Sequence, residues 1–152
     1  YVSWFPYIVV CAYLAIKNLD DRQFKKAVLV LTTGMNIFLF ISFVWPTGLN
    51  LRESIVYDLH TLSGNLLKFV QTVDTPKSVF PSMHVYVTLV LQYTLEMQKK
   101  LVPSWGIWVG RVLAVLIVLS TMFTKQHSVL DVSAAIVMFA VLAVVVEKIV
   151  KK

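Results

Sequence analysis

The segment Ser120-Thr-Met-Phe-Thr-Lys-Gln-His127-Ser-Val-Leu-Asp131 is a short polar stretch between two long apolar runs, 105–123 and 129–146. His127 and Asp131 are four residues apart, so on a helix they would share one face. A carboxylate in that position can accept the Nδ1–H of the imidazole, fix its tautomer and leave Nε2 to act as a base or nucleophile. The alternative is that Asp131 only caps a helix start, where negative charge is favourable.

The composition is that of a membrane protein, because 58% of the residues are hydrophobic and only 14% are charged. A soluble domain carries about 25% charged residues. Five apolar runs cover residues 2–16, 27–44, 79–97, 105–123 and 129–146. Most approach the ~20 residues that cross a bilayer. We therefore predict an all-α, polytopic membrane helix bundle of five spans, forming a single domain over residues 1–152. The first run begins at residue 1 without a Met, so we expect at least one further span before it.

The net charge of +6 follows the order of the loops. Basic residues gather in the first loop, the third loop and the C-terminus: Lys17, Arg22, Lys25, Lys26, Lys99, Lys100, Lys148, Lys151 and Lys152. The longer second loop has three basic residues, Arg52, Lys68 and Lys77, offset by Glu53, Asp58 and Asp74. The positive-inside rule then places the N-terminus outside and the C-terminus in the cytoplasm. We predict a multi-pass protein of a plasma or inner membrane and no nucleic-acid partner.

This topology brings a second histidine to the same face as the first. His84, in Pro81-Ser82-Met83-His84, lies near the start of the third span, just after the outer second loop. His127 lies in the fourth loop, which is also outside. Both histidines are therefore expected at the extracytoplasmic surface, where they can meet.

The second loop itself carries an amphipathic pattern. Ile55, Leu59, Leu62, Leu66 and Phe69 recur at helical spacing with polar residues between them. This pattern predicts a helix lying in the outer membrane interface, as a lid or lipid entrance. His60 belongs to that helix and is interpreted as an interfacial polar residue.

The polar residues of the outer face suit phosphoryl transfer. Pro81 favours the first turn of a helix, and the Ser82 hydroxyl with the helix N-terminus offers an anion site. His84 can protonate a leaving oxygen while His127 attacks, and Arg52 can neutralise a phosphate oxygen. This set provides a phosphohistidine route that requires no metal and no cofactor.

Two other readings remain open for the same residues. His84, His127 and Asp131 could hold zinc, although Ser82 and Arg52 would then have no role. Ionisable residues in a membrane can also mark the proton or ion pathway of a non-enzymatic transporter. Against that reading, the polar groups gather at one interface instead of crossing the midplane.

At these residues the chain resembles the type 2 phosphatidic acid phosphatase superfamily, whose motifs are K-x6-R-P, P-S-G-H and S-R-x5-H-x3-D. The second motif corresponds to residues 81–84 and the third to residues 120–131, while the first is recognisable only as Trp45, six residues and Arg52-Glu53. The resemblance covers about residues 37–135. It implies a six-helix core with the motifs at one membrane surface.

The resemblance also implies residue roles. His127 would be the nucleophile, Asp131 its activator and His84 the acid, with Ser82 and Arg52 holding phosphate. Trp45, Thr121, Met83 and Glu53 depart from the family's Lys, Arg, Gly and Pro. Lys125 and Lys77 are possible substitutes for the missing cations, and Thr121 occupies the phosphate-binding position.

We therefore expect a lipid phosphatase that acts on a phospholipid or polyprenyl phosphate among membrane lipids. Phosphatidic acid, phosphatidylglycerol phosphate and polyprenyl pyrophosphate all fit. Because a phosphodiester carries one negative charge and needs fewer cations, the alternative is a phosphotransferase that moves a head group between lipids. Family members that resemble inositol phosphorylceramide synthases likewise tolerate a bulky residue between the Ser and the His. Oligomeric state does not follow from the sequence.

Overall fold

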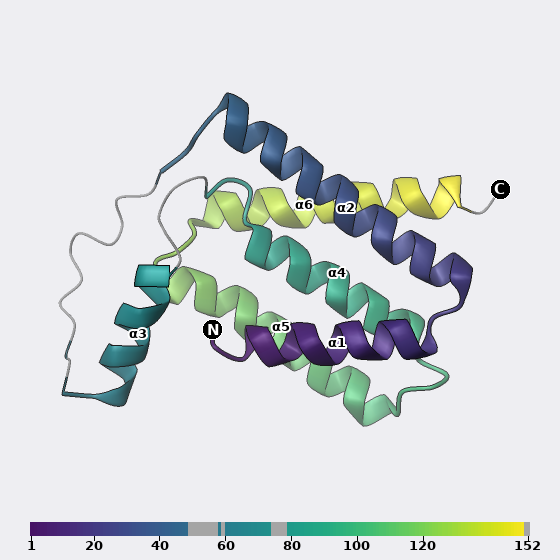
Figure 1. The fold of residues 1–152 in the computed structure, drawn as a ribbon, viewed down its shortest axis with the longest axis horizontal. Helices are drawn as coiled ribbons and strands as arrows, with labels where there is room; N and C mark the ends of the chain where they lie inside the picture. The colour runs from purple at the N-terminus through teal and green to yellow at the C-terminus, as the bar shows by residue number, and fades with distance from the viewer. Residues whose placement is uncertain (49–57, 59, 74–78, 151–152) are drawn as a thin grey trace.

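The computed structural model describes residues 1–48, 58, 60–73 and 79–150. Its helices are α1 (Trp4–Asn18), α2 (Asp21–Val44), α3 (Leu62–Val73), α4 (Met83–Met97), α5 (Ser104–Phe123) and α6 (Val129–Ile149) (Figure 1). All regular elements in these described ranges are helices, so the all-α prediction is confirmed.

Three helices are long and apolar enough to cross a membrane: α2 with 24 residues, α5 with 20 and α6 with 21. These features identify a membrane protein. The run 79–97 forms a shorter helix than expected, because α4 contains 15 residues, whereas α1, also of 15 residues, is as long as the run 2–16. A helix of that length rises ~22 Å, less than the ~30 Å of a bilayer core.

Helix α4 is short because its predicted first turn is not helical. The Ser82 hydroxyl accepts the N–H of Val85 at 3.4 Å, which makes Ser82 the N-cap and Met83 the first helical residue. The preceding backbone makes hydrogen bonds elsewhere, since Val79 N–H donates to the Thr47 carbonyl at 3.4 Å and Phe80 N–H to the Thr47 hydroxyl at 3.2 Å. Through these hydrogen bonds, the segment 79–81 before α4 is held against Thr47, just after the end of α2.

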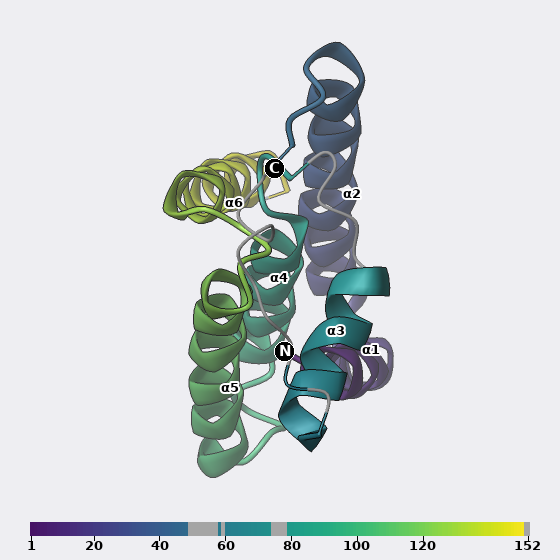
Figure 2. The same ribbon diagram turned by 90° about the vertical axis from the view of Figure 1, so that its left-hand side faces the viewer.

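Helix α4 is the centre of the bundle and packs against α1, α2, α5 and α6 (Figure 2). The contact with α2 is close. Tyr86 is fully buried, and its hydroxyl donates to the Val30 carbonyl at 2.5 Å. A Cβ on Gly34 would lie 2.1 Å from the Tyr86 ring, so only glycine admits this ring against α2. The central position of α4 fixes where its first turn, with His84, sits.

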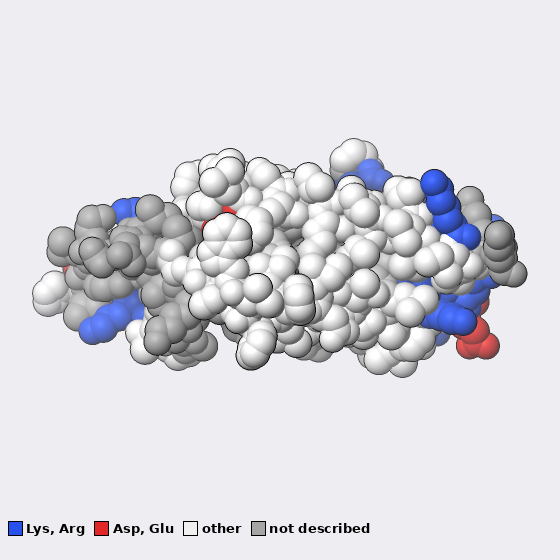
Figure 3. Space-filling model, turned by 90° about the horizontal axis from the view of Figure 1, so that it is seen from above, with Lys and Arg blue, Asp and Glu red and all other residues white. Residues whose placement is uncertain are grey.

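The end of the bundle remote from His84 is held by two ion pairs. Arg111 of α5 pairs with Glu96 of α4 through Nε at 2.6 Å and Nη2 at 3.0 Å. Lys26 of α2 pairs with Glu147 of α6 at 2.5 Å. Figure 3 shows basic side chains gathered at the end where α6 finishes, and a middle almost free of charge on the face in view. Charge at the end of the bundle and an almost uncharged middle are what a protein embedded in a bilayer requires.

Helix α3 lies across the other end of the bundle (Figures 1 and 2). It is anchored by buried Val70 and by Gln71, whose side-chain amide donates to the Thr124 carbonyl at 2.7 Å. Leu62, Leu66 and Phe69 form an exposed apolar stripe. The predicted amphipathic helix is thus confirmed over 62–73, and its residues Ile55 and Leu59 lie outside the described part of the chain. His60, predicted to belong to this helix, lies in a turn just before α3 and is exposed.

Candidate active site

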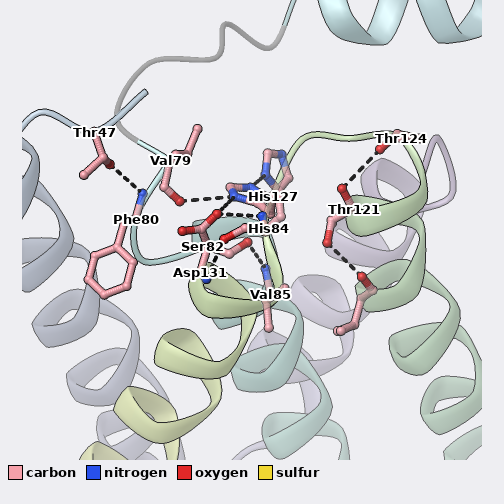
Figure 4. A network of polar contacts seen from close by, with 12 residues as sticks. Thr47, Val79, Phe80, Ser82, His84, Val85, Thr121, Thr124, His127 and Asp131 are labelled. Carbon is pink, nitrogen blue, oxygen red and sulfur yellow. Dashed lines mark hydrogen bonds and ion pairs between the residues drawn. The ribbon is translucent and has the colours of Figure 1, made fainter. Parts of the chain in front are cut away.

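The two predicted histidines meet at the end of the bundle under α3. Nδ1 of His84 lies 3.3 Å from Nε2 of His127, and the ring centroids are 5.6 Å apart (Figure 4). His84 is in the first turn of α4, whereas His127 is in the loop between α5 and α6. This contact agrees with the expectation that the two histidines can meet.

His127 is oriented by a backbone carbonyl more closely than by the predicted carboxylate. Its Nδ1 lies 3.1 Å from the Val79 oxygen and 3.9 Å from Oδ2 of Asp131, and the second distance is too long for a hydrogen bond. His127 is also not on the helix of Asp131, because α6 begins at Val129. The expected hydrogen bond from Nδ1 to Asp131 is therefore replaced by one to Val79.

Asp131 has a structural role at the start of α6. Its Oδ2 accepts the Ser128 N–H at 2.7 Å while the Ser128 hydroxyl accepts the Asp131 N–H at 3.3 Å, forming a capping box. The Asp131 carbonyl accepts the Ser82 N–H at 3.1 Å, which ties α6 to the N-cap of α4. The carboxylate is buried and remains near enough to act on His127 electrostatically.

The other nitrogen of His84, Nε2, is contacted by Tyr1 just before α1, and the ring packs against Trp4 of α1. The Tyr1 hydroxyl lies 2.5 Å from Nε2, and the Trp4 ring lies 4.6 Å from the imidazole between centroids. Trp4 is held by its own Nε1–H, which donates to the Thr88 hydroxyl at 3.1 Å. Sequence reasoning missed these partners because no local pattern links Tyr1 to a residue 83 positions away.

These contacts define one consistent set of protons. A carbonyl only accepts, so Nδ1 of His127 carries the proton that faces Val79, and its Nε2 is an acceptor. With Nε2 of His127 unprotonated, Nδ1 of His84 donates to it. The Tyr1 hydroxyl can donate to Nε2 of His84 when that ring is neutral and accept from it when the ring is an imidazolium. The pair therefore presents an unprotonated Nε2 on His127 beside a donor on His84, which is the arrangement that a nucleophile and an acid need.

Ser82 is fully buried at the start of α4. Its hydroxyl oxygen caps Val85, and within the described residues its own proton has no acceptor. A hydroxyl held at a helix N-terminus in this way can donate to an anion.

The loop after α5 is shaped by Thr121 and Lys125. The Thr121 carbonyl accepts the N–H groups of Gln126 at 3.0 Å and His127 at 3.2 Å, while its hydroxyl donates to the Val118 carbonyl at 2.7 Å. Lys125 turns the chain with a left-handed φ of 52°. Thr121 thus holds the loop through its backbone, and its hydroxyl is directed into α5.

Gln126, which precedes His127 in the loop, is a buried polar residue that sequence reasoning did not single out. The residue is 1% exposed, and neither its amide nitrogen nor its amide oxygen has a hydrogen-bond partner among the residues that the structure describes. Most buried amides form hydrogen bonds to protein or water, so the state of Gln126 needs an explanation. The only sequence signal was its place immediately before His127.

Part of the expected phosphate-binding set lies outside the described residues. This part consists of Arg52 and Glu53 of the first motif and of Lys77, a possible substitute for a missing cation. Trp45, which occupies the position of the family's first-motif lysine, is 74% exposed at the end of α2.

The zinc reading is not favoured by the side-chain directions. His84 approaches Nε2 of His127, whereas Asp131 lies on the Nδ1 side of the same ring, so the three do not converge on one point. Over the described ranges, no group of three or more His, Cys, Asp or Glu residues is placed to hold a metal ion.

The chain matches no family model, no curated protein and no solved structure.

Proposed function

We propose that the protein is an integral membrane lipid phosphatase that hydrolyses a phosphomonoester or pyrophosphate lipid through a phosphohistidine on His127. The observation that carries the proposal is the contact of 3.3 Å between His84 and His127, which are 43 residues apart in sequence. The resemblance of the motifs to the type 2 phosphatidic acid phosphatase superfamily supports the same chemistry.

In the proposed reaction, Nε2 of His127 attacks phosphorus, and the bond from phosphorus to the lipid oxygen breaks. His84, acting as an imidazolium, transfers a proton to that oxygen and becomes neutral, so the lipid leaves as an alcohol or a phosphate. Water then attacks the phosphohistidine, its proton returns to His84, and phosphate leaves with His127 regenerated. The Val79 carbonyl and the Asp131 carboxylate stabilise the positive charge that His127 carries in the intermediate.

This mechanism requires one ring to move when substrate binds. In-line displacement places the nucleophile and the acid on opposite sides of phosphorus, and a contact of 3.3 Å leaves no room for a phosphoryl group. His127 is 7% exposed and held by Val79, whereas His84 is partly exposed. We therefore assign the movement to His84, which swings away from His127 to admit the phosphate.

The phosphate would be bound by the Ser82 hydroxyl at the N-terminus of α4 and by the Gln126 amide, whose buried donors have no acceptor within the described ranges. Arg52 and Lys125 would add positive charge, as the resemblance implies. Thr121 would contribute by holding the loop that carries Gln126 and His127.

We also propose that α1 and α4, although shorter, traverse the membrane together with α2, α5 and α6, with the histidines at the extracytoplasmic face. The separation of the histidine pair from the basic residues of the first and third loops supports this orientation. It makes the site accessible to lipids of the outer leaflet.

The test is phosphate release by the purified protein from a panel of lipid phosphates in EDTA, with His127→Ala and His60→Ala as a matched pair. His60 is exposed before α3 and serves as the histidine control. We expect release that survives EDTA, disappears in His127→Ala and persists in His60→Ala. Activity that is equal in both variants would refute a phosphohistidine on His127.

The same assay separates the transferase alternative. With a labelled diester lipid and a lipid alcohol present, transfer of the head group without phosphate release would assign the enzyme to phosphotransfer. That outcome would fit a site with few cations, and it would keep His127 as the nucleophile.

A further inference from the structure

An apolar groove of about 300 Å³ runs beside His84 between α1, α2 and α4. Its walls are Trp4 of α1, Met35, Phe38 and Leu39 of α2, Met83 of α4, and the His84 ring. Met35 is 44% exposed and Leu39 is 61% exposed, so the groove opens along the outer surface of α2. In an embedded protein this surface faces lipid.

The groove is apolar along its length, apart from the His84 ring. Among its walls His84 alone can ionise or form strong hydrogen bonds, and the other walls offer carbon, sulfur and an indole. The indole N–H of Trp4 is already donated to Thr88. A ligand lying here must therefore be apolar along its length, with any polar end beside His84.

We propose that this groove binds the hydrocarbon chain of the substrate next to its phosphate, so that the substrate is a chain-bearing amphiphile entering sideways from the bilayer. The inference rests on the proposed function and adds where the substrate's chain lies. The argument is continuity, because the His84 ring is a wall of the groove and also contacts the proposed nucleophile. A chain in the groove would bring the first oxygen of its head group to the acid that must protonate it.

Two of the walls, one rigid and one flexible, determine how the groove can accommodate a hydrocarbon chain. The indole of Trp4 is fixed by its hydrogen bond at 3.1 Å and stacks at an angle on His84, so it is a rigid side. Met83 has a flexible thioether, which adapts to irregular apolar partners. The sequence position at which Met83 departs from a glycine motif is thus a position that shapes the chain site.

Binding can be tested without turnover, by photo-crosslinking the full chain in bilayer nanodiscs. The probe is phosphatidic acid with a diazirine in mid-chain, and the control is phosphatidylcholine with the same chain. We expect groove residues such as Met35 and Leu39 to be labelled preferentially by phosphatidic acid and protected by unlabelled phosphatidic acid. Equal labelling by both lipids would mean that bulk lipid fills the groove, and absence of labelling would mean that another helix covers it. Either result overturns the proposal.

Turnover gives the second arm, with Leu39→Trp to fill the groove and Leu116→Trp, on the exposed face of α5, as the matched control. We expect Leu39→Trp to raise KM for long-chain phosphatidic acid by about tenfold or more, because several methylenes lose their site. The rise in KM for a water-soluble dibutyryl analogue should be much smaller, because its short chains fill little of the groove, and Leu116→Trp should alter neither KM. An unchanged KM in Leu39→Trp would refute the groove while leaving the phosphatase intact. If no lipid is hydrolysed, the phosphatase fails and the crosslinking decides the groove alone.

Discussion

The carbonyl oxygen of Val79 lies 3.1 Å from Nδ1 of His127, closer than the carboxylate of Asp131 at 3.9 Å. The carbonyl therefore sets the tautomer of His127, and Asp131 contributes negative charge and a helix cap. This division of roles differs from a catalytic pair in which the carboxylate itself accepts the imidazole proton, and it can be measured.

Asp131→Asn should reduce kcat without abolishing it. Replacing a carboxylate that fixes a catalytic tautomer costs about 10⁴-fold, but here Val79 maintains the tautomer. The remaining loss is electrostatic, and we expect it to be on the order of 10- to 100-fold. Steady-state rates for Asp131→Asn and wild type provide the test, and a loss near 10⁴-fold would show that Asp131 does orient His127. Asp131→Ala should in addition lower Tm, since removal of a helix cap costs about 1 kcal/mol.

The role of His84 can be isolated by changing the leaving group. If His84 protonates the departing oxygen, His84→Ala should slow hydrolysis of an alkyl phosphate by about 10²- to 10⁴-fold. An aryl phosphate such as p-nitrophenyl phosphate leaves without protonation, so its hydrolysis should be far less affected. The ratio of the two rates in wild type and variant is the measurement. An equal loss for both substrates would assign His84 to binding instead.

Gln126 should be a site where stability and activity oppose each other. An unsatisfied buried amide costs about 1–3 kcal/mol, so the similarly shaped Gln126→Met should raise the thermal midpoint of the protein. If the amide binds the phosphoryl group, the same variant should lose about tenfold or more in kcat. Thermal scanning and phosphate release on one preparation test both effects. A variant that is both more stable and fully active would remove Gln126 from the site.

The sequence predicted the apolar helices and the meeting of the two histidines, because long hydrophobic runs and alternating loop charges are strong signals. It misplaced the start of α4 because Pro81 was assigned to the first turn, whereas Ser82 took the N-cap. It assigned the orientation of His127 to Asp131, since a carboxylate four residues away is visible in a sequence and the carbonyl of Val79 is not. Contacts from Tyr1 and Trp4 were missed because they depend on how α1 packs on α4.

The exposed stripe of α3 should insert into the membrane interface. Leu62, Leu66 and Phe69 point away from the bundle, with Phe69 63% exposed, and apolar area of this kind binds the boundary of the bilayer. Two variants that each add one Trp to the same native set provide the comparison. The fluorescence of the indole added by Phe69→Trp should be quenched by brominated lipids more strongly than that added by Lys68→Trp, which lies outside the stripe. Equal quenching of the two added indoles would show that α3 does not rest on its apolar face.

The contact of Tyr86 with Gly34 predicts a severe effect from a single methyl group. A Cβ at position 34 would lie 2.1 Å from the Tyr86 ring, and Tyr86 cannot retreat while its hydroxyl is bonded to Val30. Gly34→Ala should therefore force α2 away from α4 and cost about 1–3 kcal/mol. Gly106→Ala is the control, because the nearest side-chain atom to a Cβ there is 3.2 Å away, on Val102. In a double variant, Tyr86→Ala should relieve most of the added penalty of Gly34→Ala. If the shifts in thermal midpoint caused by the two single variants simply add in the double variant, the two positions do not clash.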